Sequence, residues 1–404
     1  MTPETAAQPS FRAHYEEVFL RLAGALTELL LSVGGDPARP QEISRTFDLD
    51  KTLSWKLSKL TQADDPFVSL RYVPGASGLD ILARKLGEAG ATSEHLEAVR
   101  AARAAFDSMI EVQAGDRATL ELMLESMAPE PIRTPRLEAS RKLSFQGNSA
   151  TWGVQARTRY SVHLVAPNAD DPRMVDLGNI GGFLDLRRLR PTAWPLVHLQ
   201  AFGAAEKMED LQRLDPSAGS GTFLMSEFCS SPPPDIRAHV DETGILYELA
   251  EGPVGHPQAV SCTLGWWRPS FGAAFAEDGV GTAEHIVKLD TPVEEIVFDV
   301  FIHTDLPFPS PPTASLYSLM EGRPQYPFAS QRRYRLDLPI EVKRLGSRPP
   351  VITTAEVPRY PEMLDMATKS MGTSIDQFVG YRVRLRYPPI PTFCVMSYPL
   401  VGGA

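Results

Sequence analysis

The strongest constraint on the fold of this chain comes from ISRTFDLDKTLSWKLSKL, the stretch from Ile43 to Leu60. Ile43 and Phe47 are four residues apart, so they share one face of a short helix. Asp50 is a good N-cap for a second helix, because its side chain accepts hydrogen bonds from the free amides of a first turn. The buried side of that second helix is marked by leucines at i, i+4 and i+7, which are Leu53, Leu57 and Leu60. The stretch therefore predicts two short helices joined by a tight turn around Leu49.

The side of the second helix opposite these leucines is polar and free of carboxylates. At about 100° per residue, it carries Lys51, Trp55, Ser58, Lys59 and Gln62, with Thr52 and Ser54 on its flanks. Hydroxyl groups and long polar side chains reach the edges of DNA bases, whereas lysine neutralises phosphate. This surface is typical of a helix that reads the major groove, although Trp55 is also suited to packing against another segment.

The order of residue types in this stretch follows a known pattern. A small residue follows an aliphatic one, an apolar residue occupies the turn, an acidic cap and a threonine come next, and leucines close the second helix. The residues are Ile43, Ser44, Phe47, Leu49, Asp50, Thr52, Leu53, Ser54, Leu57 and Leu60. In these residues the chain resembles the winged helix-turn-helix domains of bacterial transcription regulators. Asp48 stands where a turn glycine is frequent, and aspartate tolerates the left-handed backbone of such a turn.

The resemblance implies a domain, a partner and a set of contacts. It implies a winged helix-turn-helix domain over residues 11–90, double-stranded DNA as the partner, and a homodimer that addresses two half-sites. The expected DNA contacts are Lys51, Thr52, Ser54, Trp55, Ser58 and Lys59, with Lys56 and Arg71 on the phosphate backbone. The run PFVSLRYVPGASG, which follows Leu60, would supply two short strands and a turn as the wing.

Apolar residues at helical spacing predict helices on both sides of this motif. From Phe11 to Val33 the spacing continues over about six turns, and Gly34 and Gly35 end the helix. Further helices are predicted over residues 79–86, 93–110 and 120–127. The helices within 91–127 either complete the N-terminal core or form a dimer surface.

A change of composition marks the boundary of the first domain. Residues 128–136, APEPIRTPR, contain three prolines and predict a semi-rigid linker. Beyond it the apolar period shifts towards two, and strands are predicted over 159–165, 195–201, 222–228, 285–289, 294–303, 333–343, 381–387 and 393–398. Residues 358–370 and 374–378 look helical. The predicted fold is α+β and multidomain, with residues 137–404 forming a large, mostly antiparallel β domain, either a sandwich or a distorted barrel.

Charge and cysteine content narrow the possible partners and compartments. A formal net charge of -10 argues against coating of nucleic acid by the whole chain, so any DNA contact must be local. The cysteines, Cys229, Cys262 and Cys394, are far apart and include no CxxC pair, which indicates a reduced cytoplasmic interior. The N-terminus lacks the basic and apolar regions of a signal peptide, and no stretch predicts a membrane span.

Motifs for catalysis, metals or cofactors are weak or missing. GNIGGF at 178–183 and SAGSGT at 217–222 lack the spacing of a phosphate-binding loop, so turns are expected there. The pairs His239 with Asp241 and His303 with Asp305 have no third ligand or nucleophile beside them. Neither an enzyme nor a cofactor or metal site is therefore predicted. The basic runs RRLRP and QRRYR suit either a polyanion or solvated strand ends, and Trp266 with Trp267 suits a stacked ligand less well than ordinary sheet packing.

Two functions remain open at this level. The first is a DNA-binding transcriptional regulator, in which the helical head binds DNA and the β domain senses an unidentified effector or assembles the protein. The second is a structural or interaction protein, in which the helical head docks a protein partner and the β domain builds an oligomer. Binding of DNA and the size of the oligomer distinguish them.

Overall fold

The chain is divided between a helical part and a β part. The structure, a computed structural model, describes residues 10–127, 130–200, 210–217, 222–241, 244–276, 281–308, 310–319 and 332–402. It separates into two compact units, which we call the helical unit, Met1–Leu137, and the β unit, Glu138–Ala404. Helices dominate the first unit and antiparallel strands dominate the second, so the fold belongs to the α+β class.

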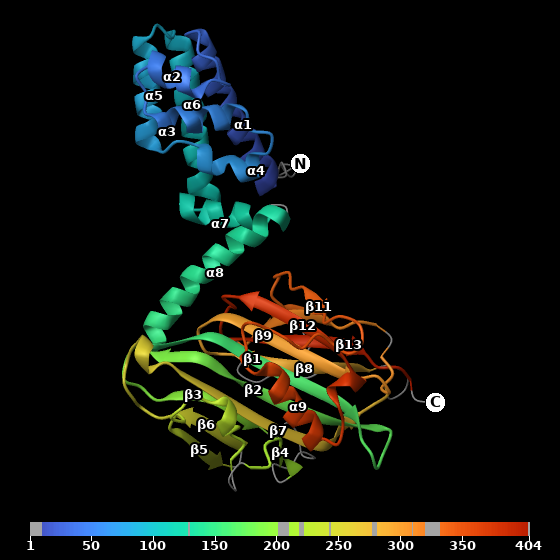
Figure 1. Cartoon of the computed structure of the whole chain (residues 1–404). Helices are drawn as coiled ribbons and strands as arrows, with labels where there is room; N and C mark the ends of the chain where they lie inside the picture. Colours follow the sequence, from blue (N-terminus) through green and yellow to red (C-terminus); the bar gives the residue numbers. More distant parts are fainter. Residues whose placement is uncertain are drawn as a thin grey trace, which may run out of the picture. The chain divides into compact units, whose positions relative to one another are not determined.

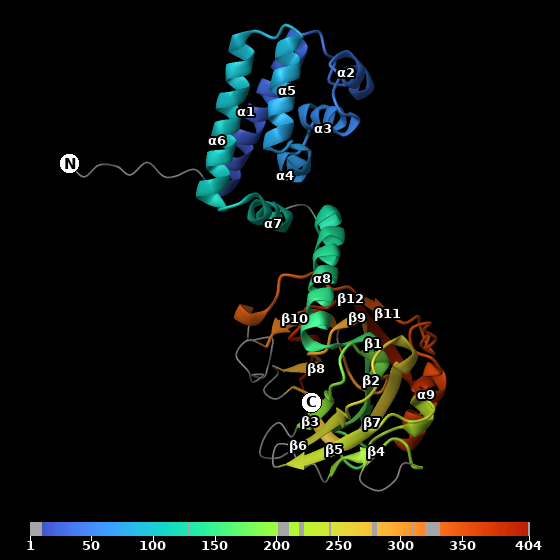
Figure 2. The same ribbon diagram turned by 90° about the vertical axis from the view of Figure 1, so that its left-hand side faces the viewer.

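The helical unit is built from short and long helices around one core (Figures 1 and 2). Its elements are α1 (Phe11–Ser32), α2 (Pro40–Thr46), α3 (Lys51–Thr61), α4 (Pro66–Ser69), a 3-10 turn η1 (Leu70–Tyr72), α5 (Ala76–Glu88), α6 (Ser93–Gln113) and α7 (Arg117–Met127). The two long helices α1 and α6 lie side by side in both views. Gly34, with a φ of 77°, follows α1 in the left-handed conformation that glycine adopts without strain.

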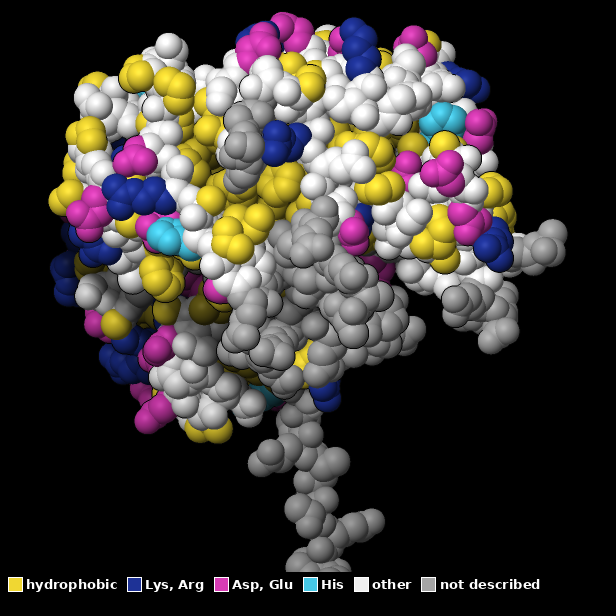
Figure 3. All heavy atoms as spheres, turned by 90° about the horizontal axis from the view of Figure 1, so that it is seen from below, with side chains coloured by type: hydrophobic (Ala, Val, Ile, Leu, Met, Phe, Trp, Pro, Cys, Tyr) yellow, Lys and Arg dark blue, Asp and Glu magenta, His cyan; other side chains and the backbone are white. Residues whose placement is uncertain are grey.

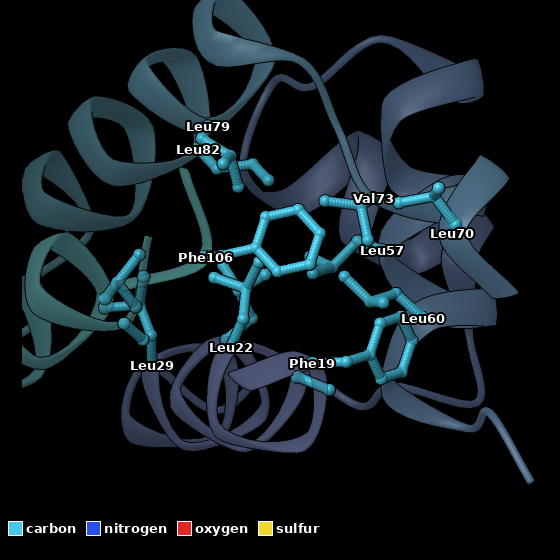
Figure 4. Close-up of a cluster of buried hydrophobic side chains, with 14 of the residues drawn as sticks. Phe19, Leu22, Leu29, Leu57, Leu60, Leu70, Val73, Leu79, Leu82 and Phe106 are labelled. Carbon is cyan, nitrogen blue, oxygen red and sulfur yellow. The ribbon is translucent and has the colours of Figure 1, made fainter. Parts of the chain in front are cut away.

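The core of the helical unit is apolar and is shared by almost all of its helices. Figure 4 shows Leu22 of α1, Leu57 of α3 and Phe106 of α6 meeting in this core. Leu57 and Leu60 are fully buried, as the leucine spacing of the sequence predicts, whereas Leu53 is only partly buried against the same core. Helices α6 and α7 contribute Val99, Ala102, Phe106, Met109, Leu120 and Leu124 to the same core. These two helices therefore complete the helical unit, and a dimer surface on them stays a prediction.

The wing predicted after the second helix is wrong. Residues 66–72 form α4 and η1 instead of strands, and α5 follows them. Asp65 caps α4 by accepting a hydrogen bond from the amide of Phe67 at 2.8 Å. Pro66 occupies the first turn, where its missing N–H has no partner to lose. The buried residues Phe67 and Leu70 are three apart, which is a helical spacing.

The proline-rich linker predicted over residues 128–136 is helical from Glu130 onward. Helix α8 spans Glu130–Trp152, and the division between the two units falls inside it, after Leu137. The second residue of α8 is Pro131, which lies in the first turn, where proline is tolerated. Pro135 comes one turn later and has no N–H to donate to the carbonyl of Pro131. Residues 128 and 129 lie outside the described residues.

The described strands of the β unit form three sheets. The largest has seven strands in the order β11-β12-β9-β1-β2-β7-β4, and the others have the orders β10-β13-β8 and β3-β6-β5. Strands β1 and β9 pair in parallel, whereas the other paired strands run antiparallel. The strands are β1 (Val154–Pro167), β2 (Met174–Arg188), β3 (Trp194–Gln200), β4 (Gln212–Arg213), β5 (Ile236–Asp241), β6 (Gly244–Leu249), β7 (Val260–Ala273), β8 (Thr282–Leu289), β9 (Val293–His303), β10 (Thr313–Ser318), β11 (Val342–Arg344), β12 (Phe378–Arg386) and β13 (Thr392–Pro399).

Both faces of the seven-stranded sheet are covered. Alternate residues of β9 point to opposite faces, so Phe298 packs against β8 and β13, whereas Phe301 packs against α9 (Tyr360–Ser370; Figure 1). Strands β3 and β6 pack over β2 and β7. The described strands therefore build layers and not the closed, distorted barrel that was one of the two predicted architectures.

Some predicted segments of the β unit are wrong in type or extent. Residues 222–228 contain a 3-10 turn instead of a strand, and only Val342 and Lys343 of the segment 333–343 belong to a strand. GNIGGF is not a turn but the middle of β2, where a side chain on Gly182 would come within 2.0 Å of the carbonyl oxygen of Cys262. Glycine is needed there because the neighbouring strand approaches too closely for any other residue. Residues 218–221 of SAGSGT, Ala201 and Gln331 lie outside the described residues.

Candidate nucleic-acid interface

Helix α3 is held in place by a turn that its own sequence specifies. Asp50 caps the helix by accepting hydrogen bonds from the amides of Thr52 at 2.8 Å and Leu53 at 3.2 Å. These backbone bonds lower the pKa of the Asp50 carboxyl group. Asp48 has a φ of 48°, which is the left-handed turn conformation expected at this position. Leu49 is buried, and its carbonyl accepts a hydrogen bond from the Ser44 hydroxyl at 2.8 Å.

The exposed half of α3 differs in two residues from the predicted DNA-contacting set. Lys51, Thr52, Trp55 and Lys59 are exposed, and Lys56 is half-buried. Ser54 and Ser58 are buried, so their predicted contact with DNA is wrong. A serine is small enough to face a neighbouring helix, and its hydroxyl stays paired inside α3. The Ser54 hydroxyl bonds the Asp50 carbonyl at 3.0 Å, and the Ser58 hydroxyl accepts from Gln62 at 3.0 Å.

The charge on this half of α3 is positive and uncompensated. Lys51, Lys56 and Lys59 form no ion pair with any carboxylate among the described residues. The acidic residues beside them are already engaged, since Asp50 binds the amides of its own helix and Asp48 binds Lys85 at 2.6 Å. The hydrogen bond from Lys85 also lowers the pKa of Asp48. A phosphate would therefore meet three cations without a competing anion.

An aromatic and cationic cluster borders the lysines. The rings of Trp55 and Tyr72 meet edge to face with their centres 5.4 Å apart. Arg71 lies over the Tyr72 ring at 4.8 Å and donates a hydrogen bond to its hydroxyl at 2.7 Å. Sequence reasoning missed Tyr72 because it was assigned to a wing strand. The pair Asp65–Pro66, a cap followed by a first-turn proline, is the signal that indicates a helix there.

The RRLRP run and the two tryptophans Trp266 and Trp267 form contacts within the β unit. Arg188 of the RRLRP run is buried and binds the carbonyls of Thr192 and Ala250. Arg187 pairs with Glu294 at 3.4 Å. Trp266 and Trp267 pack into two different cores, which is ordinary sheet packing.

The most deeply buried charges also lie in the β unit. Asp299 accepts two hydrogen bonds from Arg382, at 2.8 and 2.6 Å, and one from the Tyr360 hydroxyl. Desolvation opposes the charge of Arg382, but its hydrogen bonds to Asp299 raise its pKa above the ordinary value. All three groups are buried and satisfied by one another, so removing one of them would leave a buried polar group without its partner.

No group of three or more His, Cys, Asp or Glu side chains in the described part of the chain is arranged to hold a metal ion. On the face shown in Figure 3, Lys and Arg side chains stand beside Asp and Glu side chains, and hydrophobic side chains gather between them. A nucleic-acid backbone needs a continuous positive surface, which the described atoms of this face do not provide.

Comparison with known proteins adds no assignment. None of the described helices has the length and apolar character needed to cross a membrane. No protein-family model, curated protein or solved structure matches the chain.

Proposed function

We propose that this protein binds double-stranded DNA through the exposed half of α3 and acts as a transcriptional regulator. The observation that carries the proposal is the set of three lysines on α3 that lack carboxylate partners among the described residues. Helices α2 and α3, with the turn between them, supply the scaffold of a helix-turn-helix without a wing. Homodimer formation on the helical unit belongs to the same proposal.

The geometry supports a division of roles on α3. At about 100° per residue, the exposed residues from Lys51 to Lys59 cover less than half of the helix circumference. Lys51 and Lys59 neutralise phosphates on the two sides of a groove, Lys56 adds a third phosphate contact, and Thr52 reaches base edges from the first turn. Arg71, on η1, would contact the backbone beside them.

The test is binding of the full-length protein to duplex fragments of the source genome, measured by fluorescence anisotropy over a range of salt concentrations. Replacing Lys51 and Lys59 together with alanine should weaken binding. It should also reduce the slope of log K against log salt by about 0.9 for each phosphate that the variant no longer neutralises. The double variant Lys288→Ala, Lys369→Ala is the matched control, since it removes two exposed lysines of the β unit that pair with Asp290 and Asp365.

The control variant should bind the duplex as the unaltered protein does. Equal affinity and an equal salt slope for the α3 variant and the control would refute the proposal. Retained sequence preference in the α3 variant would show that its lysines contact phosphate and not bases.

A second function is favoured by the cluster of Trp55, Tyr72 and Arg71. These residue types are enriched at the centres of protein interfaces, and Trp55 is 45% exposed. The helical unit would then dock a protein partner while the β unit assembles an oligomer. Light scattering of the full-length protein that shows a higher-order assembly, together with no gel shift at low salt, would favour this function over DNA binding.

A further inference from the structure

Strand β5 is an open edge of the β unit. It is the last strand in the sheet order β3-β6-β5 (Figure 1), and no other described strand pairs with its second side. All of its residues except Ile236 are exposed, and Val240 is 75% exposed. The N–H and C=O groups along such an edge form a template for pairing with another strand.

Other outer strands of the β unit are protected against such pairing. The seven-stranded sheet ends in β11 and β4, which have three and two residues. The outer side of β10 is covered by the segment after it, since Tyr317 forms an isolated bridge with Arg335 and the Leu336 amide donates to the Leu316 carbonyl at 2.9 Å. Very short edge strands and covered edges are the usual protections. Strand β5 has six residues and is covered by no described strand.

The β5–β6 ladder determines which backbone groups of β5 face the open side. Its last pair is Asp241 with Gly244, and only two residues separate them in the sequence. The last pair before a connection of two residues exchanges both of its hydrogen bonds, and bonded and non-bonded pairs alternate from there. The amides of Asp241 and His239 are therefore directed at β6. Those of Val240 and Ala238 point to the open side.

The side chains of β5 complement a second copy of the same strand. Arg237, His239 and Asp241 share one face of β5, and Ala238 and Val240 share the other. Let a second β5 run antiparallel with His239 opposite its own copy. Arg237 then lies opposite Asp241 of the second copy. In the same register, the outward amides of Ala238 and Val240 meet the outward carbonyls of Val240 and Ala238.

Both charges of this cross-strand pair are accessible. Arg237 pairs with Asp235 at 3.4 Å, and the two side chains are 62% and 69% exposed, so solvent weakens that pair. Asp241 accepts a hydrogen bond from the Gly244 amide at 3.2 Å, and a carboxylate can accept bonds from an arginine as well. Between the two copies, Arg237 and Asp241 occupy a non-hydrogen-bonded position, where facing side chains approach most closely.

Other registers lose this complementarity. A shift by two residues in either direction places His239 opposite Arg237 or opposite Asp241, so no arginine faces an aspartate. A shift by one residue sets the outward backbone groups of one strand against the inward groups of the other. The charge pattern and the backbone pattern of β5 therefore select the same register.

We propose that β5 of one chain pairs antiparallel with β5 of a second copy and joins their three-stranded sheets into one continuous sheet. The two-fold axis passes between the two copies of His239, so the contact of Arg237 with Asp241 occurs twice. Strand addition of this kind obtains its affinity from backbone hydrogen bonds and its specificity from the facing side chains. The interface is separate from the dimer proposed on the helical unit and does not depend on DNA binding.

The test is the molar mass of the full-length protein, without DNA, measured by analytical ultracentrifugation over a range of concentrations. The unaltered protein should form a dimer or a larger assembly. Arg237→Glu sets like charges against each other on both sides of the axis, so the dissociation constant should rise at least about tenfold. Adding Asp241→Asn removes that repulsion, keeps an oxygen for the Gly244 amide and should recover part of the affinity. Arg173→Glu is the matched control, since Arg173 is also exposed and pairs with an aspartate two residues earlier.

Ala238→Pro tests the backbone pairing separately. Proline is tolerated in an edge strand where its missing N–H would face solvent, so the single chain should keep its fold. The outward amide is lost and the ring obstructs the second strand, so assembly through β5 should be abolished. Arg173→Glu should assemble as the unaltered protein does.

Two results would overturn the proposal. One is a monomer for the unaltered protein at every concentration tested. The other is an unchanged mass for both Arg237→Glu and Ala238→Pro, which would assign any dimer to the helical unit. Circular dichroism checks the fold of each variant. If Ala238→Pro does not fold, Arg237→Glu decides alone, because its side chain lies on the exposed face of an edge strand.

Discussion

The two units of this protein bury different kinds of side chain. Among the described residues of the helical unit, the buried serines Ser54, Ser58 and Ser69 form hydrogen bonds within four residues of the chain. The buried Tyr15 hydroxyl is the longer-range case, since it donates to the carbonyl of Pro66 at 2.9 Å. The β unit buries aspartate, arginine and histidine, and pairs them over long distances in the sequence. Asp299 binds Arg382, which is 83 residues away, and His163 contacts His285, which is 122 residues away. The described part of the helical unit is therefore stabilised mainly by apolar packing, and the β unit also depends on charge pairs that only the complete sheet brings together.

The largest expected effect comes from removing one partner of the buried pair formed by Asp299 and Arg382. Arg382→Ala leaves the fully buried carboxylate of Asp299 without its two strongest donors, and should lower the free energy of unfolding of the β unit by about 3–5 kcal/mol. Urea unfolding of the full-length protein measures it. Arg384→Ala is the control on the same strand, since its pair with Glu356 is partly exposed, and a loss of about 1 kcal/mol or less is expected. Similar losses for the two variants would show that burial does not distinguish these pairs.

The corresponding change in the helical unit removes only apolar packing. Leu57→Ala deletes a fully buried side chain from the core and should lower the free energy of unfolding of the helical unit by about 2–5 kcal/mol. Trp55→Ala on the exposed side of the same helix is the comparison and should cost much less. The transition assigned to the β unit should stay unchanged in both variants. A shared shift of both transitions would mean that the two units do not unfold independently.

Lowering the pH should lower the free energy of unfolding of the β unit, because His163 and His285 are buried in it. Burial lowers the pKa of His285 to about 4 and that of His163 well below its ordinary value. The unfolded chain protonates both near pH 6.5, so it binds more protons than the folded state below that pH. The histidines' contribution is fully present above about pH 6.5 and is lost towards pH 4, by up to about 1.4 kcal/mol per pH unit for each.

Unfolding of the β unit by urea at several values between pH 7 and pH 4 measures this loss. His285→Leu removes one of the two groups and should make the dependence on pH shallower. An unchanged slope would assign the acid sensitivity to carboxylates elsewhere in the unit.

The smallest expected effect concerns the cap of α3. Asp50→Ala removes the acceptor for two amides of the first turn and should destabilise the helical unit less than Leu57→Ala does. Asp50→Asn keeps a side-chain oxygen at the cap and should recover most of the loss. A loss as large for asparagine as for alanine would show that the charge near the helix N-terminus matters more than the hydrogen bonds.

The sequence predicts the helical unit better than the β unit, because more of its signals are local. The cap at Asp50 and the left-handed turn at Asp48 are local features, and the structure confirms them. The leucine spacing is confirmed for Leu57 and Leu60, whereas Leu53 is only partly buried. Residues 66–72 were mistaken for strands because short apolar runs look alike in both states. Serine carries no hydropathy signal strong enough to show that Ser54 and Ser58 face inward.

The β unit was harder to predict because the residues that meet in its sheets are far apart in the sequence. The long strands β2 and β7 were not predicted, since β2 contains three glycines that suggested a turn. Gly182 is needed because strand β7 approaches it closely, and no local sequence pattern reveals that approach.

The parallel pairing of β1 with β9 also has a consequence for synthesis. Strand β1 begins at Val154, and its parallel partner β9 begins only at Val293. A growing chain therefore leaves the ribosome with one edge of β1 unpaired until most of the β unit has been translated, whereas the helical unit is complete long before. Chains terminated between these strands should expose that edge to other nascent chains and aggregate, and the delay makes the β unit the part of the molecule that most needs protection by chaperones.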